Sequence, residues 1–411
     1  MKITTVEAIP IQAAFEEVYW GNQSWGHNKN SDDSAPGLPP GDSRDAYPYF
    51  WRSRAAYSRT VDTTIVKITT DSGIVGWGEA KSPVAPTITA TIIRDLAAGL
   101  LVGEDPTHPT LHWDRLYGAM RIRGGAQGFW MDAISGIDIA LWDITGKAYD
   151  LPLSILLGGR FRDRVRVYAS GIPGNRADAP PAAWDRLRAA AEDVRERGFE
   201  GTKMGIGLGV EGDVRSVQTV REVLGPDFMI FVDAAGMYGV GDALRLGRAL
   251  EPLNIGWFEA PVPPEDTAFH KTLAESLSVP IATDQVFNRW GARDLLLAGG
   301  VDVIQPDVCR TGGISECKRI ADMADASGKA ATPHVSIGSA IHFAASVGLA
   351  AALPNQTWME YWYGANPIGN SILHSPLRLE DGYLYVPDGP GLGIEVNEDA
   401  LRRFAVGEHI A

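Results

Sequence analysis

Apolar runs that each end on an acidic residue recur through the middle of the chain, and three of them end on Asp233, Glu259 and Asp284. These acids are spaced by about 25 residues, roughly the length that a strand, a helix and two short loops need. Short apolar runs bounded by turn residues are typical of strands buried on both faces of a sheet, and such strands are parallel. The pattern therefore predicts strand–helix units whose acids lie at the same end of neighbouring strands.

Carboxylates gathered at one edge repel one another unless a cation lies between them. Three oxygen ligands with room left for water and substrate suit Mg²⁺. One such acid alone would more often be a solvated loop residue or a helix N-cap, but three in phase favour a metal site. We therefore expect Asp233, Glu259 and Asp284 to bind one Mg²⁺ ion.

From about residue 126 onward, short apolar runs alternate with helical patterns. The clearest helices are expected over 131–149, 182–197 and 213–224. The expected strands cover 165–171, 201–205, 229–233, 255–259, 280–284, 301–307, 329–334 and 357–361. Eight strands separated by helices within about 250 residues indicate an α/β protein with a (β/α)8 barrel.

The first 125 residues read differently, as an α+β unit. Strands are expected over 2–11, 63–70 and 74–79, and a helix over 87–101. We expect the last stretch, 377–411, to return to this N-terminal unit. The predicted division of the chain is therefore 1–125, 126–376 and 377–411.

An aromatic-rich insert, roughly 15–60, separates the first two expected strands. It carries Trp25, His27, Arg52 and Arg54 among Gly, Pro, Ser and Asn residues. A long loop of this kind in a compact protein is usually a lid or a surface segment. Its aromatic and arginine content favours a lid that binds a polar ligand, and the alternative is that the aromatic residues only pack on the neighbouring domain.

Composition narrows the class of partner. The 411 residues carry a formal net charge of −14, which argues against nucleic acid because a phosphate backbone needs a basic surface. A small anionic substrate remains possible, since local cations and a metal override the average field. Two cysteines form no disulfide framework, so a reducing, cytoplasmic location is expected. The N-terminus does not resemble a signal peptide, and no apolar run reaches membrane-spanning length.

Four further residues lie at the expected strand ends, where barrel enzymes place their chemistry. Lys203 ends the second strand and could hold a substrate carboxylate or carry a proton, although a surface lysine is the alternative. Asp307 and His334 end the sixth and seventh strands. A lone histidine is more often structural, yet an Asp beside it on the next strand would set its tautomer and raise its basicity. Glu360 on the eighth strand could donate or accept a hydrogen bond to an enolate oxygen, but only if its pKa is raised.

These groups fit one reaction. A carboxylate substrate would chelate Mg²⁺, which makes its α-proton acidic enough for His334 to remove. If the β-carbon carries a hydroxyl group, its loss as water gives a 2-oxo acid.

At this point the chain resembles the mandelate racemase-like branch of the enolase superfamily, and the resemblance spans nearly its whole length. The motifs that carry it are Gly-Trp-Gly-Glu at 76–79, Ser-Gly-Ile-Asp-Ile-Ala-Leu-Trp-Asp at 135–143, Phe-Val-Asp-Ala at 231–234, Trp-Phe-Glu-Ala-Pro at 257–261, Gln-Pro-Asp-Val at 305–308, Thr-Gly-Gly-Ile at 311–314 and Thr-Pro-His at 332–334. The resemblance implies a modified (β/α)8 TIM barrel with an α+β capping domain formed from both termini. It also implies one Mg²⁺ held by Asp233 and Glu259, a base dyad of Asp307 and His334, and an acid at Glu360.

The chain departs from that branch at four places. The second strand usually carries Lys-x-Lys, but here Gly205 follows Lys203 and Met204, so a second base on the opposite face of the substrate is missing. The fifth strand usually ends in Gly-Glu; here Asp284 comes one position early and Gln285 follows as the competing third ligand. In addition, Ala235 stands in place of an Asn and Ala260 in place of a second Glu, which shifts polar contacts near the metal.

The prediction that follows is a Mg²⁺-dependent sugar-acid dehydratase that yields a 2-keto-3-deoxy acid. A sugar-lactone cycloisomerase is the runner-up, because Pro-Asp-Gly-Pro-Gly-Leu-Gly-Ile at 387–394 also resembles relatives that isomerise lactones. A racemase or epimerase comes third, and an inactive sugar-acid binding protein represents a different class. The expected partner is a small carboxylate, with assembly into a homo-oligomer and no membrane contact.

Overall fold

The computed structural model describes residues 1–14, 26–28, 55–57, 60–265, 267–284 and 286–407. The predicted lid over 15–60 therefore lies almost wholly outside the described residues, as do Trp25, Arg52, Arg54 and Gln285. Only two short strands of it are described, β2 (Gly26–Asn28) and β3 (Ala55–Tyr57), which pair in parallel. The side chain of His27 in β2 is not described.

Eight parallel strands form the barrel, in the order β13, β6, β7, β8, β9, β10, β11, β12. The strands are β6 (Arg164–Pro173), β7 (Gly201–Gly205), β8 (Met229–Asp233), β9 (Ile255–Glu259), β10 (Ile281–Thr283), β11 (Val303–Ile304), β12 (Ala330–Ala331) and β13 (Met359–Trp362). Thr332 joins β12 to β13, because its hydroxyl donates to the Trp358 carbonyl at 2.6 Å. The predicted barrel is confirmed.

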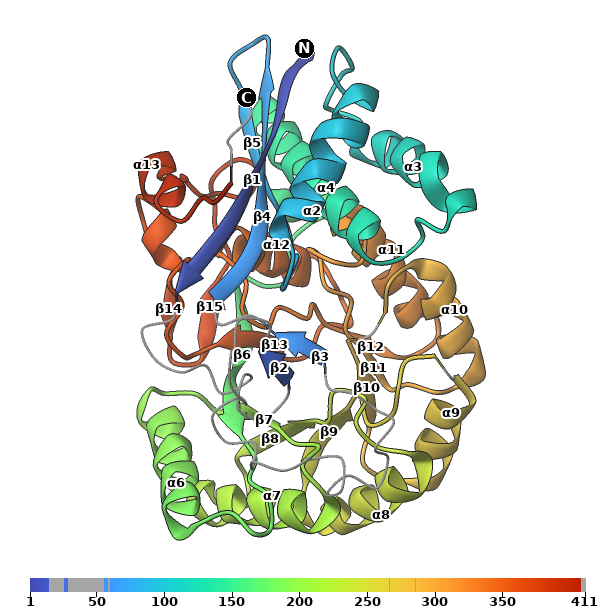
Figure 1. Cartoon of the computed structure of the whole chain (residues 1–411), viewed down its shortest axis with the longest axis vertical. Coiled ribbons are helices and arrows are strands. Elements are labelled where there is room, and N and C mark those ends of the chain that lie inside the picture. The colour runs from blue at the N-terminus through green and yellow to red at the C-terminus, as the bar shows by residue number, and fades with distance from the viewer. Residues whose placement is uncertain (15–25, 29–54, 58–59, 266, 285, 408–411) are drawn as a thin grey trace.

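Seven of these strands are followed by a helix that covers the outside of the barrel. The helices are α6 (Pro181–Glu196), α7 (Val210–Leu224), α8 (Val240–Leu250), α9 (Thr267–Ser276), α10 (Arg289–Ala298), α11 (Gly313–Ala326) and α12 (Ala340–Ala351). Figure 1 shows α6 to α10 arranged as an arc around the strands. The described chain after β13 instead continues into η5 (Asn370–Ile372) and the hairpin of β14 (Leu379–Glu380) and β15 (Tyr383–Tyr385), so the barrel is a modified one.

The strands β10, β11 and β12 are shorter than the sequence pattern predicts. Predicted strands over 280–284, 301–307 and 329–334 are each reduced to two or three residues. Pro306 and Pro333 have no N–H to donate to a ladder, which ends β11 and β12 early. A single parallel bridge between Asp307 and His334 follows beyond them, and it brings these two residues side by side.

Aromatic side chains fill the barrel below its carboxyl end. The Phe231 and Trp257 rings stack with centroids 3.8 Å apart, and Tyr168 lies 4.8 Å from Phe231. On the same strands, alternate residues such as Ile230 and Phe258 pack outward against the helices. These aromatic side chains form an apolar layer one residue pair below the acids Asp233 and Glu259 on the same strands.

A three-stranded antiparallel sheet lies over the barrel at the top of Figure 1. It consists of β1 (Ile3–Ala14), β4 (Thr60–Thr70) and β5 (Val75–Ala80), with helical segments α2 (Pro86–Ile92), η1 (Ile93–Ala97), η2 (Ala98–Leu100), α3 (Pro109–Met120), η3 (Arg121–Arg123) and α4 (Phe129–Tyr149). Gly78 on β5 lets α4 approach closely, because a Cβ there would meet the Gly136 carbonyl oxygen at 1.9 Å. α4 therefore packs directly on this sheet.

The C-terminal segment contacts both parts of the molecule. β15 pairs antiparallel with β6 of the barrel. The backbone N–H of Gln12 in β1 donates to the backbone carbonyl of Phe404 at 2.9 Å. The remaining short helices are α5 (Leu153–Leu156) and α13 (Glu398–Arg402). The division at residues 125 and 376 stays a prediction, since α4 and β15 each pack across it.

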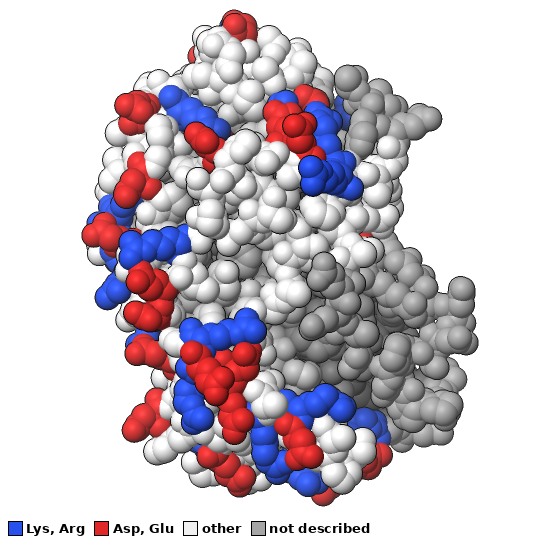
Figure 2. All heavy atoms as spheres, turned by 90° about the vertical axis from the view of Figure 1, so that its left-hand side faces the viewer, with Lys and Arg blue, Asp and Glu red and all other residues white. Residues whose placement is uncertain are grey.

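Figure 2 shows acidic and basic side chains lying next to one another across the face that forms the left-hand side of Figure 1. Several of the described ion pairs are local, such as Arg188 with Asp185 on α6 and Arg197 with Asp193 at the C-terminal end of that helix. Among the described residues, no helix is long and apolar enough to cross a lipid bilayer.

Candidate active site

The carboxyl ends of the barrel strands bring seven predicted residues to one mouth. Lys203 lies in β7 and Glu360 in β13, while Asp233 and Glu259 end β8 and β9 and are cross-strand neighbours. Asp284 directly follows β10, while Asp307 and His334 lie three residues beyond the ends of β11 and β12. Parallel strand direction places them there, because every strand of the barrel points the same way.

Lys203 lies at the centre of the acidic group. Its Nζ is 2.8 Å from Glu259 Oε1, 3.0 Å from Glu360 Oε1 and 3.4 Å from Asp233 Oδ2. Burial alone would lower the pKa of Lys203, but Glu259 and Glu360 outweigh it and raise that pKa well above its usual value. Lys203 is therefore a buried ammonium group and not the surface lysine of the alternative interpretation.

Glu259 is held on both oxygens. Its Oε1 accepts from Lys203, and its Oε2 accepts from the Trp257 indole and the Gln305 amide, each at 3.1 Å. Asp233 Oδ1 accepts from the Ala235 amide at 2.8 Å. Ala235 takes a φ of 47° for this, a left-handed conformation that asparagine adopts more readily than alanine.

The negative charge of the group exceeds what its cations balance. Burial, and after it the neighbouring Glu259 carboxylate, raise the pKa of Asp233 to about 8. Burial also raises the pKa of Glu259, despite the Lys203 ammonium beside it. Such shifts mean that the carboxylates lack sufficient compensating positive charge. Carboxylate oxygens are the donors that a hard divalent cation such as Mg²⁺ prefers, and Asp233, Glu259 and Asp284 stay its predicted ligands.

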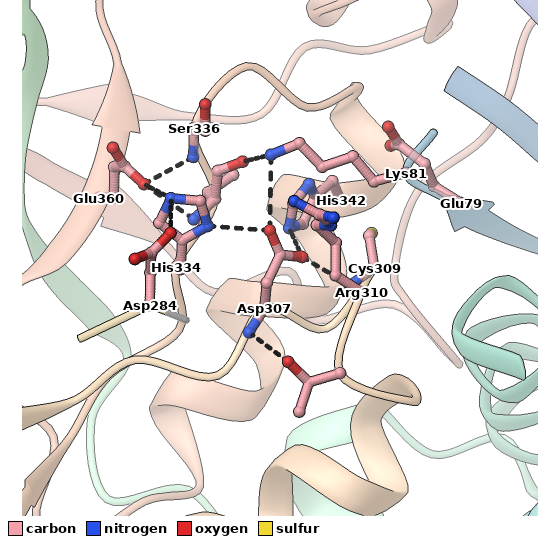
Figure 3. A network of polar contacts seen from close by, with 12 residues as sticks. Glu79, Lys81, Asp284, Asp307, Cys309, Arg310, His334, Ser336, His342 and Glu360 are labelled. Atoms are coloured by element: carbon pink, nitrogen blue, oxygen red, sulfur yellow. Dashed lines mark hydrogen bonds and ion pairs between the residues drawn. The ribbon is translucent and has the colours of Figure 1, made fainter. Parts of the chain in front are cut away.

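His334 lies between the acidic group and Asp307 (Figure 3). Its Nδ1 is 2.9 Å from Asp307 Oδ2, and its Nε2 is 3.7 Å from Asp284 Oδ2 and 3.5 Å from Glu360 Oε2. Because an ionised Asp307 can only accept, the proton of neutral His334 lies on Nδ1. Nε2 then carries a free lone pair that faces the mouth of the barrel.

Asp307 is surrounded by donors and cations. His342 Nε2 lies 3.1 Å from its Oδ1, the Cys309 amide donates to the same oxygen at 2.8 Å, and Lys81 Nζ lies 3.5 Å from Oδ2. Burial would raise the pKa of Asp307, but His342 and Lys81 outweigh it and lower that pKa well below its usual value. Asp307 is therefore ionised and supports a protonated His334.

The pKa of His334 follows from the same contacts. Burial would lower it, but the Glu360 carboxylate and the bond to Asp307 raise it overall. A raised pKa makes His334 a stronger base than free imidazole.

Glu360 does not have the raised pKa that a hydrogen bond to an enolate oxygen would require. Its Oε1 accepts from the Ser170 hydroxyl at 2.6 Å, and its Oε2 accepts from the Val335 and Ser336 amides at 2.9 and 2.6 Å. Burial alone would raise its pKa, but Lys203, His334 and these donors lower it overall. Glu360 is an ionised acceptor here, because the loop after β12 folds back and presents its amides to it.

Two residues of this network, Lys81 and His342, were not predicted from the sequence. Lys81 follows β5 and donates to the Val335 carbonyl at 2.8 Å as well as facing Asp307. His342 is a buried histidine within the otherwise almost wholly apolar helix α12. A lysine just after an apolar strand, and a histidine inside an apolar helix, are the signals that could have found them.

Two family models match the chain. The mandelate racemase / muconate lactonizing enzyme N-terminal domain model matches residues 53–158, and the enolase C-terminal domain-like model matches residues 186–400. D-galactarolactone cycloisomerase from Agrobacterium fabrum is 40% identical over 349 residues, which cover 83% of this chain and 90% of that relative. Arabinonate dehydratase from Saccharolobus solfataricus is 35% identical over 346 residues, which cover 84% of this chain and 91% of that relative.

A solved structure shares the whole architecture. The crystal structure of the 3,6-anhydro-D-galactonate cycloisomerase from Zobellia galactanivorans superimposes with a TM-score of 0.82 at 30% sequence identity. The match covers 99% of this chain and all of that one, so the upper sheet and the barrel are both shared.

Proposed function

The chain belongs to the mandelate racemase / muconate lactonizing enzyme family of the enolase superfamily, and from that membership we propose that it dehydrates a sugar acid. The reaction would remove the proton next to the carboxylate, expel the β-hydroxyl group as water and yield a 2-keto-3-deoxy acid. One observation carries this proposal: the Asp307–His334 pair, joined at 2.9 Å, turns its free ring nitrogen toward the carboxylates of Asp284 and Glu360.

Asp233, Glu259 and Asp284 would hold the Mg²⁺ ion in this proposal. Bound there, Mg²⁺ would draw the substrate carboxylate into the mouth and make the α-proton more acidic. Lys203 now bridges Glu259, Glu360 and Asp233. With Asp233 and Glu259 bound to Mg²⁺, the Lys203 ammonium group would be able to bind a substrate oxygen. Its raised pKa supports that binding role and argues against a role as base.

His334 would take the α-proton on Nε2. Asp307 holds Nδ1 and stabilises the imidazolium that results, while Lys81 and His342 keep Asp307 ionised. The leaving hydroxide needs a proton, and the ionised Glu360 has none to give. His334 would therefore return its proton to the β-oxygen, which requires that both groups leave from the same face of the substrate.

Racemisation needs a second base, and the residue at the position expected for that base, Gly205, favours elimination instead. Gly205 lies level with Asp233 in the β7–β8 register and has no side chain. Lys203, two residues earlier, is enclosed by three carboxylates. Inversion at the α-carbon needs a proton from the face opposite His334, and Gly205 supplies none.

A lactone cycloisomerase is the second candidate, favoured by the name of the 40% identical relative. The same step at His334 would start it, but a ring carboxylate would leave in place of hydroxide. A carboxylate leaving group needs no proton, which suits a mouth in which Glu360 is ionised.

The deciding experiment is a screen of sugar acids and sugar lactones with Mg²⁺, followed by mass spectrometry of the products. A 2-oxo acid that is lighter than its substrate by one water supports the dehydratase, whereas a 2-oxo acid of unchanged mass from a lactone supports the cycloisomerase. Absence of both products from every substrate would contradict the proposal.

His334→Asn tests the base directly. We expect turnover to fall by about 10²–10⁴-fold or more, because only the proton acceptor is lost, while Mg²⁺ affinity is retained. His374→Asn, on an exposed histidine away from the mouth, should turn over like the wild type. Full turnover by His334→Asn would rule out His334 as the base.

A further inference from the structure

The mouth of the barrel offers a nitrogen ligand beside its carboxylates. Glu259, Asp284 and His334 each present one ligand atom, and these atoms lie within 4.8 Å of one another. His334 Nε2 and Asp284 Oδ2 are 3.7 Å apart. Two ligands bound to one tetrahedral ion at ~2.0–2.1 Å lie about 3.3 Å apart, so His334 and Asp284 need a shift of a few tenths of an ångström, and Glu259 one of at most about 1.5 Å, for all three to bind the same ion.

The surroundings of His334 match those of a metal-binding histidine. Such a histidine usually donates its other ring N–H to a carboxylate, which sets the tautomer and raises the basicity of the ligating nitrogen. His334 Nδ1 does this with Asp307 at 2.9 Å (Figure 3). The pair that makes Nε2 a base therefore also makes it a good ligand.

We propose that Zn²⁺, or another transition-metal ion of similar softness, binds to Glu259, Asp284 and His334 and thereby blocks the base. This donor set differs from the all-oxygen set of Asp233, Glu259 and Asp284. Imidazole nitrogen favours zinc over magnesium, which prefers oxygen and keeps its water. The proposal rests on the same mouth as the proposed function but not on the identity of the substrate.

The charges and contacts allow such an ion to bind. Two carboxylates and a neutral imidazole balance one divalent ion. Glu259 Oε1 would exchange its bond with Lys203 for the ion, and Lys203 would keep Glu360 and Asp233 at 3.0 and 3.4 Å. The side chain of Asp284 is 26% exposed, so the ion has a route from solvent. Because Glu259 and Asp284 belong to both donor sets, Zn²⁺ and Mg²⁺ should exclude each other.

Co²⁺ is the probe for this site, since its visible absorption is strong with four ligands including nitrogen and weak in a six-coordinate oxygen site. The full-length protein, freed of metal, is titrated with CoCl₂ without substrate. We expect an intense band with one Co²⁺ per chain, which Zn²⁺ abolishes and excess Mg²⁺ diminishes. A weak octahedral spectrum, or a band that Mg²⁺ leaves unchanged, would overturn the proposal.

Variants locate the nitrogen ligand. His334→Asn and His334→Gln should each lose the intense band and bind Co²⁺ at least ~10-fold more weakly, while their Mg²⁺-induced rise in melting temperature persists and reports a folded protein. His374→Asn is the matched control and should bind Co²⁺ like the wild type. An unchanged band in either His334 variant would refute the site. Turnover with Mg²⁺ is measured separately, so failure of this inference and failure of the proposed function give different results.

Discussion

At the scale of single residues, Asp307 links His334, the proposed base, to the rest of the molecule. It lies between two histidines, with Lys81 beyond one oxygen and the Cys309 amide on the other. Each of these groups favours its ionised form, and the pKa of Asp307 is correspondingly low. The basicity of His334 therefore also depends on Lys81 and His342, which act on it through Asp307.

Lys81→Met should move the pH dependence of the enzyme. The Lys81 ammonium lowers the pKa of both His334 and Asp307, so its removal raises the pKa of the base. Because the base works only when neutral, the acidic limb of kcat/KM should shift to higher pH. Lys318→Met, which removes a partly exposed lysine on α11, should leave the limb where it is. If the acidic limb of kcat/KM does not shift in Lys81→Met, the Lys81 ammonium does not act on the Asp307–His334 pair.

Asp233→Asn should weaken Mg²⁺ binding without destabilising the metal-free protein. An acid whose folded-state pKa is raised to about 8 favours the folded state when protonated, and this stabilisation is lost as pH rises through that value. At about pH 8.5 the metal-free variant should therefore melt no lower than the metal-free wild type. MgCl₂ should raise the melting temperature of the wild type by several degrees and that of the variant much less. An equal Mg²⁺ response in both proteins would exclude Asp233 as a ligand.

At the scale of elements, α4 (Phe129–Tyr149) connects the upper sheet to the barrel through buried acids. Asp138 accepts from the Ser315 amide at 2.9 Å and from its hydroxyl at 2.6 Å, and so caps the start of α11. Gly313 makes this approach possible, because a Cβ there would lie 2.3 Å from Asp138 Oδ2. Burial nevertheless raises the pKa of Asp138 to about 7, against the effect of the Ser315 bonds.

Asp138→Asn should flatten the pH dependence of stability. With a folded-state pKa of about 7 and an ordinary value of 3.8, the stabilisation from protonated Asp138 is full below about pH 4. It is lost as pH rises through about 7, up to ~4 kcal/mol in all. Urea unfolding at about pH 5 and 8 should show a smaller loss of stability in the variant than in the wild type. Exposed Asp185→Asn should keep the wild-type difference, and an undiminished loss in Asp138→Asn would contradict the assignment.

At the scale of the whole molecule, the upper sheet and the C-terminal segment meet at Asp143 on α4. Its Oδ2 accepts from the Trp77 amide of β5 at 3.0 Å and from Lys147 at 2.7 Å, and its Oδ1 accepts from the Leu392 amide at 2.9 Å. Gly391 passes against this carboxylate, where a Cβ would lie 2.2 Å from Oδ1. One buried side chain thus joins residues that are 66 and 249 positions away along the chain.

Asp143→Ala should destabilise the whole fold. It would leave two buried backbone N–H groups and the Lys147 ammonium without their partner, at a cost of about 3–5 kcal/mol. The urea midpoint should fall accordingly, while exposed Asp322→Ala, which breaks a surface pair with Lys318, should change it by less than ~1 kcal/mol. A midpoint within that smaller range for Asp143→Ala would show that the junction contributes little.

Much of this molecule follows from local sequence alone. The regular return of apolar runs, each with a helix behind it, was enough to predict the barrel, since parallel strands joined by helices have few ways to pack. The same regularity placed Asp233, Glu259 and Asp284 at one end, because an acid that follows a strand must lie at its carboxyl edge. The lengths of β11 and β12 were predicted wrongly, although Pro306 and Pro333 were visible, because an apolar run does not reveal where its neighbour stops pairing.

Only the tertiary structure decided the charges and partners within that mouth. The sequence predicted a lysine facing the acidic group at Lys203, but not its three carboxylate partners or the lowered pKa of Glu360. Lys81 reaches Asp307 across 226 residues of chain. A pKa depends on burial and on charges a few ångströms away in space, whereas sequence patterns report spacing along one strand or helix. The sequence thus determined which groups reach the mouth, and folding determined what each of them does there.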